Sequence, residues 1–263
     1  MSESPIVKVP VPEVTVAAYR AVFSRLGAVL EIGWLPLLIL LGVSIVPAVL
    51  PVDFGADNTA LRALPDFLDL VAGALCLNAF GVRWYQAQLF GHAGAAARPW
   101  VGPWGRFLLY TFVLYVVLGA AVASVFVLAT AAQDRGLAIE IVSFLVDLAV
   151  AVALLFTMAR LSLLFPAAAA GEPIGLRGAW RATRGNAWRI VLCWFFATAP
   201  LLIGVQIVMG AAFAGVGGGA TRAPMGLFIL RGLVGTVADF LIEALDAVVL
   251  AEFYRRLIEA AES

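Results

Sequence analysis

The chain has 263 residues, of which 63% are hydrophobic and 13% are charged, and its mean hydropathy is +1.01. This composition excludes an ordinary soluble domain, because apolar segments of such length need a bilayer to cover them. The 17 basic and 17 acidic side chains cancel, so no overall positive field would attract nucleic acid. The sequence predicts an all-α, polytopic integral membrane protein.

The N-terminal segment, residues 1–33, is predicted to be cytoplasmic and to contain an amphipathic helix. Glu3 and Pro10 are incompatible with the apolar core of a secretory signal. Between Val14 and Leu30 apolar residues recur at helical spacing, while polar residues such as Arg20 take the opposite face. We expect this helix to lie in the headgroup layer. The alternative is that these residues are the start of the first span.

Six apolar segments are each long enough to cross a hydrocarbon layer of about 30 Å. They cover approximately residues 34–51, 68–90, 107–131, 138–165, 190–216 and 226–253. We expect them to pair into three helical hairpins, with a second interfacial amphipathic helix before the fifth span. Residues 34–253 are therefore predicted to form a six-helix transmembrane domain, followed by a cytoplasmic tail at residues 254–263.

The distribution of basic residues predicts the orientation of the spans. With the N-terminus inside, three basic residues, Arg62, Arg135 and Arg222, fall on the outer side. The inner side then holds eleven: Lys8, Arg20, Arg25, Arg98, Arg106, Arg177, Arg181, Arg184, Arg189, Arg255 and Arg256. Basic residues are retained on the cytoplasmic side of a membrane, so both termini are expected to be cytoplasmic.

The segment before the fifth span is the most basic part of the chain, and two tryptophans, Trp180 and Trp188, lie within it. Arginines and indole rings together are typical of the headgroup region of a bilayer. Its arginines are therefore predicted to contact anionic headgroups: Arg177, Arg181, Arg184 and Arg189.

Charged side chains inside the spans mark the candidate functional site. Four of them in the sixth span are separated by eight, four and three residues, which places them on one helical face. Each costs roughly 2.5 to 3.5 kcal/mol near a bilayer centre, so this face must look toward partners or water. With charged residues of the second and fourth spans they form a predicted polar cluster: Asp239, Glu243, Asp246, Arg231, Asp147, Arg83 and Arg160.

Two interpretations of this polar cluster stay open. In the structural one, Arg83 or Arg160 pairs with Asp246 and Glu243, and the ion pairs fix the register of the helices. In the functional one, the carboxylates left without a cation, Asp239 and Asp147, carry protons or bind a cationic substrate.

One stretch carries a family resemblance. It consists of Arg160-Leu-Ser-Leu-Leu-Phe-Pro166, a short linker with Glu172, and Gly178-Ala-Trp-Arg-Ala-Thr-Arg-Gly-Asn186 before a tryptophan-bearing span. This pattern resembles a group of bacterial six-helix membrane proteins that includes the membrane domain of some glycerophosphoryl diester phosphodiesterases and related uncharacterised families. The resemblance implies a helical, multi-pass protein of the bacterial inner membrane. It does not imply phosphodiesterase activity, because the catalytic barrel of those enzymes is a separate soluble domain.

No catalytic or metal-binding pattern is present. His92 is the single histidine, so it cannot complete a zinc site, and Ser162 lacks a histidine partner for nucleophilic catalysis. The sequence favours a protein that is not an enzyme and needs no cofactor, most simply a scaffold or accessory subunit of a membrane assembly. The alternative is a small transporter or lipid-handling protein whose path passes the acidic face of the sixth span. The expected partners are membrane lipids, other membrane proteins or a second copy of the chain.

Overall fold

The computed structural model describes residues 8–49, 59–132, 137–172, 174–214 and 225–259, and every regular element within them is a helix. The elements are α1 (Val11–Phe23), α2 (Leu26–Val49), α3 (Thr59–Ala97), α4 (Val101–Ala132), α5 (Leu137–Leu161), α6 (Leu164–Ala170), α7 (Gly175–Ala182), α8 (Ala187–Ala214), α9 (Met225–Tyr254) and a π-helical turn, η1 (Arg255–Glu259). The all-α prediction is confirmed over these residues.

Five segments are long and apolar enough to cross a membrane, which makes the chain a multi-pass membrane protein. They are Leu26–Ile45, Phe67–Ala97, Val101–Ser124, Ile141–Ala170 and Ala187–Ala212. Each has a mean hydropathy between 1.3 and 2.5. The sixth long helix, α9, has 30 residues but carries charged side chains along much of its length.

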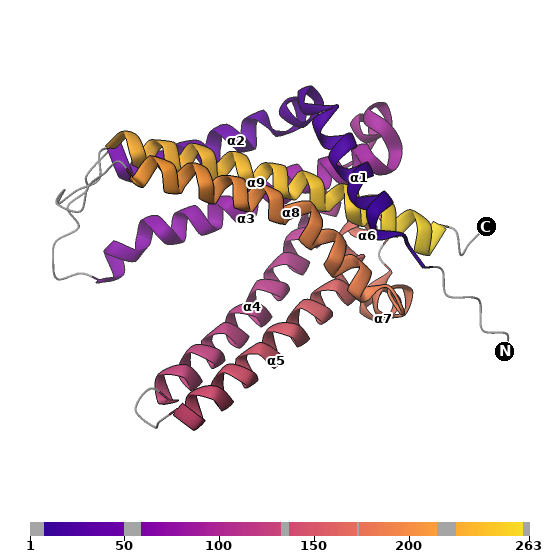
Figure 1. The fold of residues 1–263 in the computed structure, drawn as a ribbon. Coiled ribbons are helices and arrows are strands. Elements are labelled where there is room, and N and C mark those ends of the chain that lie inside the picture. The colour runs from indigo at the N-terminus through magenta and orange to yellow at the C-terminus, as the bar shows by residue number, and fades with distance from the viewer. Residues whose placement is uncertain (1–7, 50–58, 133–136, 173, 215–224, 260–263) are drawn as a thin grey trace.

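The long helices form two groups (Figure 1). Four of them, α2, α3, α8 and α9, run alongside one another, whereas α4 and α5 run together and diverge from the others. The helix α9 packs against α1, α2, α3, α6 and α8, so it forms the centre of the molecule. The short helices α1, α6 and α7 gather at one end, which also holds the end of α9.

Short helices do precede α2 and α8, although the boundaries differ from those predicted. The amphipathic helix expected to continue to Leu30 breaks after Phe23, and α2 begins at Leu26. The buried side chains of α1, Val14, Ala18 and Val22, are spaced four residues apart and therefore lie on one face of the helix. Through this face α1 packs against α8 and α9.

Two predicted boundaries are wrong for local reasons. The expected loop from Gly91 to Gly105 is largely helical, because α3 continues past a kink at Gly91, whose φ of 74° suits glycine, and α4 begins at Val101. The helix of the expected fourth span breaks after Leu161, and the chain restarts as α6 within the apolar segment Ile141–Ala170. The left-handed Gly171, with φ of 84°, ends α6.

Other predictions fall on connecting segments. Arg62, expected in the first outer loop, lies in α3. The outer-loop residues Arg135 and Arg222 lie outside the described residues. Residues 255–259 of the expected C-terminal tail are helical and form η1, and residues 260–263 are outside the described part.

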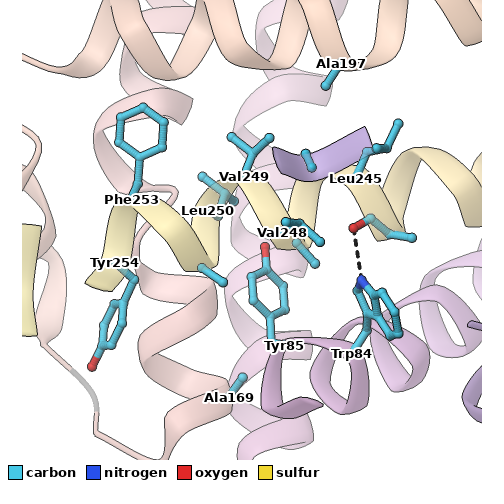
Figure 2. Packing of buried hydrophobic residues seen from close by; sticks show 14 of the residues in the cluster. Trp84, Tyr85, Ala169, Ala197, Leu245, Val248, Val249, Leu250, Phe253 and Tyr254 are labelled. Atoms are coloured by element: carbon cyan, nitrogen blue, oxygen red, sulfur yellow. Dashed lines mark hydrogen bonds between the residues drawn. The ribbon is translucent and has the colours of Figure 1, made fainter. Parts of the chain in front are cut away.

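The core surrounds the C-terminal half of α9, where buried side chains of α1, α3, α6 and α8 pack against it (Figure 2). The fully buried Trp84 donates a hydrogen bond from Nε1 to the carbonyl oxygen of Ala244, at 3.0 Å. One turn before it, the ring of Phe80 packs against Phe240 of α9, with their centroids 5.0 Å apart. A buried indole gains its full apolar contribution only when its N–H is paired, so this bond fixes the contact between the two helices.

Candidate functional site

Glu243 is the central acidic residue of α9, and it points at α3. A Cβ atom added to Gly81 would lie 2.5 Å from Oε1 of Glu243 and 3.4 Å from Cζ of Phe107. The carboxylate therefore occupies the space that a side chain at position 81 would fill. The absence of a side chain at Gly81 is what allows Glu243 to fit between α9 and α3.

Asp246 lies nearly one turn beyond Glu243, toward the end of the molecule that holds α1 and α6. Its Oδ1 atom is buried and has no hydrogen-bond partner among the described residues. Tyr85 of α3, also buried, lies within electrostatic range of both carboxylates. A buried oxygen without a partner costs free energy unless a proton or a ligand satisfies it.

Asp239 lies one turn before Glu243, and it is exposed. Asp69 of α3 is within its electrostatic range and accepts a hydrogen bond from Oγ of Ser44 at 2.8 Å. Tyr115 of α4, which is 52% exposed, lies within range of Asp239 and Glu243. The acidic face of α9 is therefore flanked by α3 and α4.

Asp69, Tyr115 and Gly81 are not among the site residues predicted from the sequence. Asp69 sits near the start of an apolar segment, where a single acid resembles a boundary residue. A glycine within an apolar segment at position 81 is the signal that could have pointed to a close approach between helices. Tyr115 carries no such signal, because its position depends on how α4 is placed against α9.

The predicted ion pairs between arginines and this acidic face are not formed. Arg83 donates from Nη1 to the carbonyl oxygen of Ala95 at 2.9 Å, and its guanidinium lies 5.8 Å from the ring centroid of Trp100. Arg160 donates from Nη1 to the carbonyl oxygen of Trp180, also at 2.9 Å. Both cations stay at helix ends, where carbonyl groups without helical partners accept their hydrogen bonds.

The ion pairs that the described residues do form lie elsewhere. Glu252 pairs with Arg255 at 3.5 Å and with Arg256 at 2.6 Å, and Arg256 also approaches Glu13 of α1 at 3.7 Å. These contacts tie the end of α9 to α1. Within the described part of the chain, no cation is paired with Asp239, Glu243 or Asp246.

Two further members of the predicted cluster are separate from the acidic face. Asp147 lies on α5, which packs against α4, α7 and α8, and its buried Oδ1 has no hydrogen-bond partner among the described residues. Arg231 is exposed, two turns of α9 before Asp239, and lines a hollow with Gln206 and Met209 of α8. Of the seven residues predicted to form one cluster, the structure brings together the three acids of α9.

The predicted headgroup arginines divide into two classes. Arg177, Arg181 and Arg184 are exposed, on α7 or just after it. Arg189 is half-buried and donates from Nη1 to the carbonyl oxygen of Val9 at 2.8 Å, while the N–H of Val9 donates to Oδ1 of Asn186 at 3.1 Å. Arg189 therefore holds the chain before α1 against α8.

The remaining candidates offer no chemistry. His92 is exposed at the kinked end of α3, and its ring lies 6.4 Å from that of Trp84. Over the described residues, no three histidine, cysteine or acidic side chains are placed to hold a metal ion. No family model, curated protein or solved structure matches the chain. The acidic face of α9 is therefore the candidate functional site.

Proposed function

We propose that the protein is a small transporter of the bacterial inner membrane that moves a cation or a cationic amphiphile past Asp239, Glu243 and Asp246. The observation that carries this proposal is the absence of a paired cation for these carboxylates among the described residues. In a purely structural cluster, each carboxylate would be expected to be paired with a cation and shielded from water. This one has a buried, unpartnered oxygen on Asp246 and an exposed carboxyl on Asp239.

The carboxylates on the acidic face of α9 need to be neutralised. Glu243 and Asp246 lie within a segment flanked by apolar helices, where two isolated negative charges are costly. A proton or a bound cation neutralises each of them. Binding of a cation C⁺ to a protonated carboxyl then follows RCOOH + C⁺ → RCOO⁻·C⁺ + H⁺, so that cation uptake releases a proton. This exchange is the chemistry of a proton-coupled antiporter.

Access to the carboxylates is supported by the exposed side chains around them. Asp239 of α9 and Tyr115 of α4 are both exposed, and Tyr115 lies within electrostatic range of Asp239. An aromatic side chain therefore lies near the exposed carboxylate. This combination suits an organic cation better than a bare metal ion, because the face of an aromatic ring attracts a cation and also contacts its hydrocarbon.

The membrane topology forms part of the proposal. We infer that α9 is the sixth span, since 30 residues extend about 45 Å. Six spans arranged as three hairpins, with α1 and α7 in the headgroup layer, put both termini on one side. The large excess of arginines at the end with α1, α6 and α7 favours the cytoplasm for that side.

The test is binding of tetraphenylphosphonium to the purified protein in detergent. We expect saturable binding that releases protons into weakly buffered solution, weakens as the pH falls, and is lost in Glu243→Gln. Asp147→Asn serves as a matched control, because Asp147 is a second carboxyl with an unpartnered oxygen that lies apart from the acidic face of α9. Binding that survives Glu243→Gln, or that is equally sensitive to Asp147→Asn, would contradict the proposal.

A scaffold role is the second candidate, favoured by the apolar surface of the α4–α5 pair. Large side chains are exposed on both helices, including Phe112 at 66% and Phe144 at 65%. The pair diverges from the other long helices (Figure 1), so it offers apolar surface that a neighbouring membrane protein could cover. Native mass spectrometry of the protein in gently extracted membrane would detect such a partner as a stoichiometric complex.

A further inference from the structure

We propose that the chain has a binding site for an anionic phospholipid on the surface formed by α5, α7 and α8. This surface is separate from the acidic face of α9, and the proposal does not depend on the transport function. Two hollows lie on it, and both present mostly apolar atoms; Arg177, Arg181 and Trp180 border the first, and Phe156, Trp188 and aliphatic side chains line the second. The arginines at the edge of the first would hold the headgroup, and the second would hold the acyl chains.

The headgroup hollow has a volume of about 380 Å³ and lies where α7 meets the end of α5. Arg177 and Arg181 of α7 line it together with Trp180, Leu161 and Leu176. The two arginines are four residues apart and therefore project from the same side of α7. Both can therefore contribute to the binding of one phosphate at the edge of the hollow.

The segment around this hollow carries an excess of positive charge. Between residues 164 and 190 the sequence has four arginines and a single acidic residue, Glu172. Arg189 is engaged with Val9, whereas Arg177, Arg181 and Arg184 are exposed and form no ion pair with another described residue. Such a site complements a phosphate carried at a membrane surface.

The acyl-chain hollow is larger, about 560 Å³, and lies between α5 and α8. Its lining includes Ala149 and Ala153, which are one turn apart and leave room along the helix, together with Leu145 and Val152. The lining contains no charged side chain. Its shape and chemistry therefore suit hydrocarbon.

Three aromatic rings connect the two hollows. Phe156 lies between them, with its centroid 6.4 Å from that of Trp180 in the headgroup hollow and 5.9 Å from that of Trp188 in the acyl-chain hollow. Tryptophan rings settle at the boundary between headgroups and acyl chains. Along the surface, the arginines are followed by the indole rings and then by apolar side chains. This order matches the phosphate, the interface and the acyl chains of a phospholipid.

The headgroup hollow is preorganised, because α7 is fixed to the end of α5. The Arg160 guanidinium lies over the Trp180 ring at 4.9 Å and donates to its carbonyl oxygen, and Oγ1 of Thr183 donates to the carbonyl oxygen of Arg160 at 3.1 Å. These contacts place α7 without using Arg177 or Arg181. The two arginines are free to bind a ligand, and no ordering of the backbone is required on binding.

The test is native mass spectrometry of the protein in detergent, incubated with equal amounts of dioleoyl phosphatidylglycerol and dioleoyl phosphatidylcholine. The wild type should retain the anionic lipid in preference. Each arginine removed by Arg177→Gln and Arg181→Gln should weaken retention about fivefold. The pair Arg20→Gln and Arg25→Gln, exposed arginines near the same end of the molecule, is the charge-matched control and should retain the lipid as the wild type does.

A second variant tests the acyl-chain hollow and a small soluble ligand tests the source of the phosphate. Ala149→Phe with Ala153→Phe fills the hollow at lipid-facing positions, where the fold tolerates larger side chains, and should weaken lipid retention without removing charge. Glycerol 3-phosphate should not compete with the lipid. Unchanged retention in either double variant, equal loss in the Arg20 and Arg25 control, or competition by glycerol 3-phosphate would overturn the proposal.

Discussion

Replacement of Gly81 by alanine probes the contact that positions Glu243. The added methyl group would lie 2.5 Å from Oε1 of Glu243, about 1 Å closer than ordinary van der Waals contact allows. Oε1 is the far end of a flexible side chain, so the carboxyl can swing away, at the lower end of the about 1 to 3 kcal/mol that overpacking costs. We therefore expect Gly81→Ala to give a free energy of unfolding about 1 kcal/mol lower than a Gly→Ala replacement without this contact, measured by titrating the protein in mixed micelles with a denaturing detergent.

A double-mutant cycle isolates the contact. Gly73→Ala, eight residues earlier on the same helix, is the matched control, because no atom lies within 4 Å of its added Cβ. It should stabilise by about 0.5 to 1 kcal/mol, the helix propensity gained. In a Glu243→Ala background Gly81→Ala should stabilise by the same amount. If Gly81→Ala behaves like Gly73→Ala in the wild type, Glu243 does not occupy the space above position 81.

Two further substitutions test other contacts. Asn186→Ala removes the acceptor of the buried N–H of Val9 and should cost about 1 to 3 kcal/mol, with faster proteolysis before α1 in a limited-digestion assay; Arg184→Gln, exposed nearby, should change neither. The hydroxyl of Tyr19 donates to the carbonyl oxygen of Ala197 at 2.8 Å, and burial raises the pKa of this phenol. The stabilisation that Tyr19 contributes is therefore fully present below the ordinary pKa of 10.0 and is lost as the pH rises through the raised pKa of the folded state. Tyr19→Phe should cost about 1 kcal/mol at neutral pH and reduce the loss of stability above pH 10, followed by fluorescence; an unchanged alkaline profile would contradict this assignment.

The helical elements could be predicted because membrane-spanning helices need long apolar segments, a property of each segment alone. Each of the six predicted spans overlaps a long helix, from α2 to α9, and five of these helices contain a segment long and apolar enough to cross a membrane. The breaks at Ser24, Gly91 and Ser162 could not be located, since the apolar composition continues across or beside them. Whether a helix bends or restarts there depends on tertiary packing, as in the burial of α6 beneath α3 and α4.

The candidate site was predictable in part for the same reason. Helical spacing alone places Asp239, Glu243 and Asp246 on one face of α9. Their partners depend on the placement of other helices. The position of Arg83 along the second predicted span places it at the same depth in the membrane as Asp246. In the structure, however, Arg83 donates to the carbonyl oxygen of Ala95 at the kinked end of α3. A long, flexible arginine side chain binds the nearby acceptor that requires the least desolvation of its charge. The identity of that acceptor cannot be read from spacing along the chain.

The roles of the arginines at the α7 end show the same limit. Sequence composition correctly marked the segment before α8 as the most basic part of the chain. It did not distinguish Arg189, which secures Val9, from Arg177 and Arg181, which line a hollow. That distinction depends on a contact between residues 180 positions apart.

Cation binding at the acidic face of α9 can be tested by labelling with dicyclohexylcarbodiimide, a membrane-permeant reagent that modifies protonated carboxyl groups in apolar surroundings. Modified peptides would be identified by mass spectrometry, with and without tetraphenylphosphonium. If the acidic face of α9 binds cationic substrates, label should appear at Asp239 or Glu243, and the cation should slow its incorporation there. Label confined to other carboxyl groups, such as the ion-paired Glu252, or labelling of Glu243 that the bound cation leaves unchanged, would contradict the central claim.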